Sequence, residues 1–105
     1  MVNNFGPEKG SLMHALERCG TAVRSAIVSE ADLPTRLQNA FDRHMSHLRP
    51  PEFPQEIWER VERLRAQVHS DTVGSGDNAA RCLKEMLDIY EDVAKSYFSR
   101  FPEAL

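Results

Sequence analysis

Apolar residues recur at steps of three and four through four stretches of the chain, and this spacing predicts α-helices. The predicted helices cover about residues 7–28, 33–48, 54–70 and 78–100. Pro50 and Pro51 end the second helix, because proline lacks an amide donor and clashes one turn back. The sequence DTVGSGDN at 71–78 is typical of a loop. We therefore predict a single all-α domain over residues 1–105, and the short connections favour an antiparallel up-down-up-down four-helix bundle.

The fourth predicted helix is the most apolar of the four. At roughly 100° per residue, its apolar side chains between Cys82 and Phe101 fill about half of the helix surface. An ordinary surface helix needs an apolar stripe only somewhat wider than ~100°. We therefore expect this helix to contact two neighbours, or one neighbour and another chain, with Leu83, Met86 and Tyr90 buried.

The other three helices carry narrower apolar stripes, which we expect to face a common core. The stripes are Leu12, Leu16, Cys19, Val23, Ala26 and Ile27 in the first helix, Leu33, Leu37, Ala40, Phe41, Met45 and Leu48 in the second, and Ile57, Val61, Leu64 and Val68 in the third. Gly20 lies inside the first helix and weakens it by ~1 kcal/mol relative to alanine.

Composition and charge are those of an ordinary globular protein. Hydrophobic residues make up 41% of the chain and charged residues 28%, both near the average. The formal net charge is -3 and no segment carries the basic footprint that phosphate binding requires, so we expect no nucleic-acid partner. The N-terminus lacks a signal-peptide pattern and no apolar run approaches membrane-spanning length, so we expect no membrane partner. The two cysteines lack CxxC spacing, and a reduced cytoplasmic protein is the simplest interpretation.

Two histidines in the second helix are candidate metal ligands. His44 and His47 are three residues apart and are expected to face the bundle interior, as are Cys19 and Cys82, so the four side chains suggest a Cys2His2 zinc site. In an up-down bundle, however, Cys82 would lie ~15 to 20 Å from the two histidines. We therefore favour an interior pair of hydrogen-bonded histidines, with no metal and no cofactor, and keep His44, His47 and Cys19 as the candidate ligands.

A third histidine, His14, lies opposite the apolar stripe of the first helix and should be exposed. The stretch His14-Ala15-Leu16-Glu17-Arg18 resembles the histidine-phosphotransfer bundles, in which an exposed histidine is followed by a leucine, a lysine and then a small glycine. The resemblance implies that His14 accepts a phosphoryl group. Only the histidine and the leucine match, because Glu17 replaces the lysine and Arg18 places bulk where a receiver domain needs room. The alternative is an ordinary exposed histidine.

Two flanks are candidate interfaces. The first is in the third helix, because tryptophan and arginine are favoured at protein–protein contacts. The second is in the C-terminal half of the fourth helix, where we expect surplus apolar surface to be covered in a homodimer. The candidates are Trp58 and Arg65 in the third helix and Leu87, Tyr97, Phe98 and Phe101 in the fourth. Trp58 has an alternative role as a cover for the bundle edge, with the Arg65 stem lying over it.

No phosphate loop, nucleophile elbow or catalytic triad occurs in the sequence. We therefore predict a cytoplasmic helical-bundle protein that acts by protein–protein contact, as a regulator, an adaptor or a homodimer. A phosphotransfer-like or other small helical enzyme and a metal-binding bundle remain the alternatives.

Overall fold

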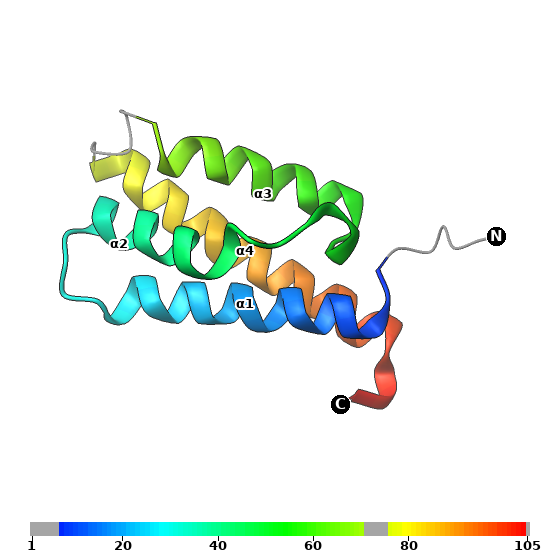
Figure 1. The fold of residues 1–105 in the computed structure, drawn as a ribbon. Helices are drawn as coiled ribbons and strands as arrows, with labels where there is room; N and C mark the ends of the chain where they lie inside the picture. Colours follow the sequence, from blue (N-terminus) through cyan, green and yellow to red (C-terminus); the bar gives the residue numbers. More distant parts are fainter. Residues whose placement is uncertain (1–6, 71–75, 105) are drawn as a thin grey trace.

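A computed structural model describes residues 7–70 and 76–104, and all regular structure in these two ranges is helical. The four α-helices are α1 (Lys9–Val28), α2 (Leu33–Ala40), α3 (Gln55–Val68) and α4 (Gly76–Arg100). Three short turns accompany them, namely the π-helix η1 (Phe41–Met45) and the 3-10 helices η2 (Pro50–Glu52) and η4 (Pro102–Ala104). Figure 1 shows the four helices packed into one elongated body, 45 × 25 × 20 Å. The prediction of an all-α fold with four packed helices is confirmed, whereas residues 71–75 of the predicted loop lie outside the described residues.

The predicted stripes supply most of the core. The whole stripe of α3 is buried, and Met86 of α4 is fully buried as predicted. Leu83 and Tyr90 are only partly buried and pack against the core from its edge. Ile27, which the spacing assigned to the core, is 57% exposed, because it lies one residue before the end of α1 and at the edge of its stripe. Among the described helices, none is long and apolar enough to cross a membrane.

α1 and α4 approach each other closely at Gly20. A Cβ atom placed on Gly20 would lie 2.9 Å from Cε1 of Tyr90, so a larger residue fits only if the ring moves. Lys9 lies eleven residues before Gly20, and its Nζ is 5.9 Å from the ring centroid of Phe101, which lies eleven residues after Tyr90. These two contacts show that α1 and α4 lie side by side along much of their length (Figure 1).

The second predicted helix changes character after Ala40. The amide of Ser46 donates to the carbonyl of Phe41 at 2.9 Å, which is the i to i+5 hydrogen bond of a π-helix. This wider turn alters the angular positions of the residues that follow. His44 is only partly buried and His47 is exposed, so the prediction of an interior histidine pair was wrong.

Candidate functional site

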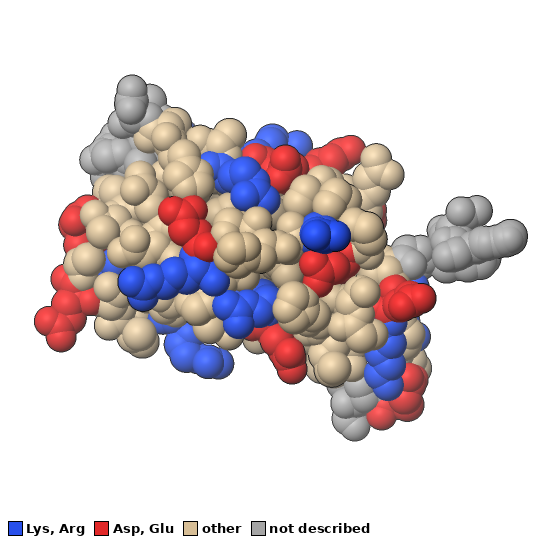
Figure 2. Space-filling view, in the orientation of Figure 1, with Lys and Arg blue, Asp and Glu red and all other residues tan. Residues whose placement is uncertain are grey.

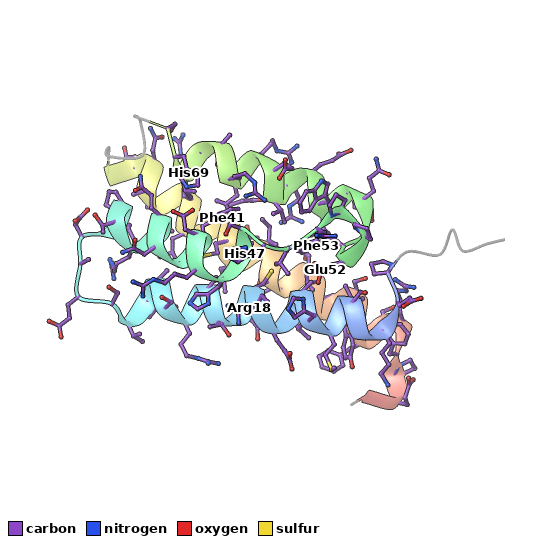
Figure 3. The ribbon with its side chains drawn as sticks, viewed as in Figure 1. Arg18, Phe41, His47, Glu52, Phe53 and His69 are labelled. Carbon is purple, nitrogen blue, oxygen red and sulfur yellow. The ribbon has the colours of Figure 1, made fainter. Side chains whose placement is uncertain are left out.

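Polar contacts gather where the connection between α2 and α3 crosses α1 and the end of α3. Three side chains of this connection, Asp42, His44 and Glu52, each contact a side chain of another helix. Each of these contacts includes a histidine. Figure 3 shows Arg18 and Glu52, which take part in two of these contacts, and His47 and His69 on the same side of the molecule. This region therefore gathers the candidate chemistry of the described chain.

Arg18 of α1 holds the end of the π-turn. Its Nε donates to the carbonyl of His44 at 3.3 Å, and its Nη2 donates to the carbonyl of Arg43 at 3.3 Å and to Nδ1 of His44 at 2.7 Å. Since Nδ1 accepts this hydrogen bond, the His44 ring is neutral and carries its proton on Nε2. Burial, assisted by the charges of Arg18 and Arg43, lowers the pKa of His44. The bulky side chain that departs from the phosphotransfer pattern thus caps the carbonyl end of a helical segment.

A second arginine, Arg36, donates to a backbone carbonyl at the end of α1. Nη1 of Arg36 in α2 donates to the carbonyl of Ile27 in the last turn of α1, at 3.5 Å. Figure 2 shows basic side chains gathered over α1 and α2 on this face, with acidic side chains among them. Because Arg18 and Arg36 contact backbone carbonyls, this concentration of positive charge has a structural use within the fold.

His14 is exposed, as predicted, and it is oriented by a carboxylate. Its Nδ1 contacts Oε2 of Glu52, whose other oxygen accepts the backbone amide of Arg49 at 2.9 Å. The Glu52 side chain is only 15% exposed, whereas that of His14 is 54% exposed. When the ring is neutral and its proton lies on Nδ1, toward Glu52, the lone pair is on Nε2.

His69 is fully engaged by its neighbours. Its Nδ1 lies 2.8 Å from the carbonyl oxygen of Arg65, and its Nε2 lies 2.8 Å from Oδ1 of Asp42. The ring also meets the edge of Phe41, with centroids 6.1 Å apart. Both ring nitrogens are therefore occupied, and the residue ties the end of α3 to the π-turn.

The candidate metal ligands are not brought together. In the described part of the chain, no group of three or more His, Cys, Asp or Glu side chains could hold a metal ion. Burial, with a smaller contribution from the charge of Glu52, raises the pKa of the Cys19 thiol to about 12. Burial also raises the pKa of Cys82, whose Sγ lies 3.9 Å from Oε1 of Gln67. Both thiols are free and remain protonated at neutral pH.

The six candidate interface residues differ in their exposure. Leu87 is 38% exposed, whereas Tyr97 is buried, with rings of Phe98 and Phe101 packed on it at 5.1 and 5.6 Å. Trp58 is partly buried against Phe53, with ring centroids 5.7 Å apart. The sixth candidate, Arg65, lies with its guanidinium 5.1 Å from the centroid of the Phe41 ring and pairs with Glu62 at 3.0 Å.

Among the described residues, the exposed large apolar side chains other than Leu87 lie on α1. Met13 is 41% exposed and Val28 70% exposed, in addition to Ile27. Between them a shallow hollow of about 580 Å³ lies over the middle of α1, and its lining includes Glu17, Gly20, Thr21 and Arg24. The sequence pattern assigns one apolar stripe of each helix to the core. It therefore does not predict a second group of apolar side chains on the solvent side of α1.

The surface of α1 and the contacts of the α2–α3 connection are thus the two candidate sites in the described residues. Comparison with known proteins identifies no relative from which a function could be transferred. No protein family, curated protein or solved structure matches this chain significantly.

Proposed function

We propose that this protein acts through protein–protein contact and forms a homodimer. The observation that carries the proposal is the placement of its exposed large apolar side chains. In the described residues these are Met13, Ile27 and Val28 on α1 and Leu87 on α4. Scattered exposed apolar residues need no explanation, but a group on adjacent helices marks a contact surface.

Three of these side chains lie along α1, and Leu87 lies on the adjacent helix α4. Met13, Gly20 and Ile27 follow one another at steps of seven along α1, so they share one side of the helix. Since Gly20 lies against Tyr90, residues near Arg24 lie beside Leu87 one turn earlier in α4. The apolar group therefore extends across both helices, and a two-fold dimer is the commonest way to cover such a surface.

We also propose that the four helices form an antiparallel up-down-up-down bundle. The hydrogen bond from Arg36 to the carbonyl of Ile27 supports opposite directions for α1 and α2, which meet at their connection. The approach of Cys82 to Gln67 supports the same for α3 and α4. The variant Gln67→Cys should accordingly form a disulfide with Cys82 on mild oxidation, and failure to do so would contradict this pairing of α3 with α4.

We also propose a cytoplasmic location. The free thiols of Cys19 and Cys82 support a reducing compartment, since secreted domains of this size commonly pair their cysteines. Fractionation of cells that produce the tagged protein tests the location directly, and recovery in a secreted or periplasmic fraction would overturn it.

The homodimer is tested by sedimentation velocity at about 100 μM protein, where a dimer is expected. Ile27→Glu and Leu87→Glu should shift the protein toward monomer while leaving its helical circular dichroism unchanged, because both residues are exposed. Ala66→Glu is the matched control, since it adds the same charge at an exposed position of α3. A monomeric unmodified protein at this concentration would refute the proposal.

A second candidate function rests on the contact between His14 and Glu52. The carboxylate holds the Nδ1 proton, so Nε2 could attack the phosphorus of an acyl phosphate, with loss of the carboxylate leaving group. Incubation with acetyl phosphate followed by mass spectrometry tests this chemistry. A labile phosphate on His14 that disappears in His14→Gln would support it, and an unmodified His14 would exclude it.

A further inference from the structure

The solvent-facing side of α1 is complementary to itself when the helix is reversed end for end. Glu17 lies three residues before Gly20, and Arg24 lies three residues after Thr21. Met13 lies seven residues before Gly20, and Val28 lies seven residues after Thr21. If the helix is reversed about the point between Gly20 and Thr21, Glu17 and Arg24 therefore exchange positions. Met13 and Val28 also exchange positions.

These side chains share one side of the helix. At 100° per residue, Met13, Glu17, Arg24 and Val28 fall within about 60° of one another. All four are exposed. A second α1 laid antiparallel across this side would meet all of them.

Neither charge is neutralised within one copy. Glu17 and Arg24 are separated by about 10.5 Å along the helix axis, which is too far for an ion pair. Within residues 7–70 and 76–104, no ion pair to either side chain is present. Both charges therefore remain available to a partner.

The middle of this surface leaves room for another helix. The hollow over α1 is lined by Gly20 and Thr21, by Glu17 and Arg24 on either side of them, and at its edges by His14, Leu16, Arg18 and Tyr90. Gly20 has no side chain, and the Tyr90 ring covers it only on the side of α4. The Thr21 hydroxyl donates to the carbonyl of Glu17 at 2.9 Å, which holds it against its own helix. Small residues at a crossing point allow two helices to approach closely.

We infer that two copies of this chain associate through α1, packed antiparallel on α1 of the second copy about a two-fold axis near Gly20 and Thr21. Glu17 of each copy then pairs with Arg24 of the other, and Met13 of each copy packs on Val28 of the other. Two-fold symmetry forms every contact twice, so a short self-complementary surface gives four contacts. This inference rests on the proposed homodimer and specifies its geometry.

Charge reversal tests the geometry. Glu17→Arg and Arg24→Glu each place two pairs of like charges across the axis and should weaken dimerisation about tenfold or more. The double variant Glu17→Arg/Arg24→Glu restores opposite charges and should recover the dimer. Glu59→Arg, at an exposed position of α3, is the matched control and should have no effect. Circular dichroism confirms that each variant is folded.

A cysteine near the axis gives a second readout. Thr21→Cys should cross-link two copies under mild oxidation, because the two residues lie close together across the axis, whereas Ala66→Cys should not. An unmodified protein that is monomeric overturns the proposed homodimer together with this geometry. A dimer that persists in both single variants, or that the double variant fails to restore, overturns the α1 geometry alone.

Discussion

Replacement of Gly20 by alanine has two opposing effects on stability: it raises the helix propensity of α1 and it crowds the contact with α4. Within a helix, alanine is more favourable than glycine by ~1 kcal/mol. At Gly20, however, the added methyl group would lie 2.9 Å from Cε1, 3.4 Å from Cζ and 3.6 Å from Cδ1 of Tyr90. The ring is rigid and presents three atoms to the methyl group, so it cannot relieve the clash by a small rotation at its tip.

The packing cost should exceed the gain in propensity. Overfilling a packed contact costs typically 1 to 3 kcal/mol, so with a cost of ~2 kcal/mol Gly20→Ala should lose about 1 kcal/mol of unfolding free energy. In a Tyr90→Leu background the two nearest ring atoms are absent, and the same substitution should then gain about 1 kcal/mol. The expected coupling between the two positions is therefore ~2 kcal/mol.

Urea unfolding of the four proteins, followed by circular dichroism at one low protein concentration, measures this coupling. Gly10→Ala is the internal control, because nothing lies within 4 Å of a Cβ at that position of α1. It should leave stability unchanged or raise it slightly. If Gly20→Ala stabilises the protein equally in both backgrounds, α1 and α4 do not approach each other at Tyr90.

Three further outcomes are expected. Met86→Ala should lose about 2 to 5 kcal/mol of unfolding free energy in urea titrations, because Met86 is fully buried, and a loss below ~1 kcal/mol would show that α4 is not central. Cys19 and Cys82 should react with a thiol reagent only after unfolding, since burial raises both pKa values, and rapid reaction of the folded protein would contradict their placement. The pKa of His44 is lowered below 6.5 in the folded state, so the unfolded state binds more protons and stability should fall as pH drops below about 6.5. His44→Gln should reduce that fall, as measured by unfolding between pH 7 and pH 5, and an unchanged pH profile would contradict the neutral ring hydrogen-bonded to Arg18.

The sequence was sufficient where one helix face decides the structure. The stripe Ile57, Val61, Leu64 and Val68 repeats at a regular spacing, and all four side chains are buried. Periodicity reports burial well in this case, because α3 remains a regular α-helix to its last turn and buries a single side.

The sequence was insufficient where contacts between distant residues decide the structure. A helix of uniform pitch places His44 in the core, but His44 lies within the π-turn from Phe41 to Met45, where the pitch is wider. No local pattern announces this turn, whose carbonyls are satisfied by Arg18 from another helix. The orientation of His14 likewise depends on Glu52, which lies 38 residues away along the chain.

The contact between Arg18 and the end of the α2–η1 segment has a consequence for how the backbone amides exchange with solvent. α2 has 8 residues, too few for a stable helix in isolation. The carbonyls of its π-helical extension accept hydrogen bonds from the Arg18 guanidinium, which is in place only when α1 packs against this segment. In native-state hydrogen exchange, the amides of α2 and η1 should therefore open together with the α1 contact as one cooperative unit, and Arg18→Ala should accelerate their exchange while leaving the slowest amides of α4 close to their original rates.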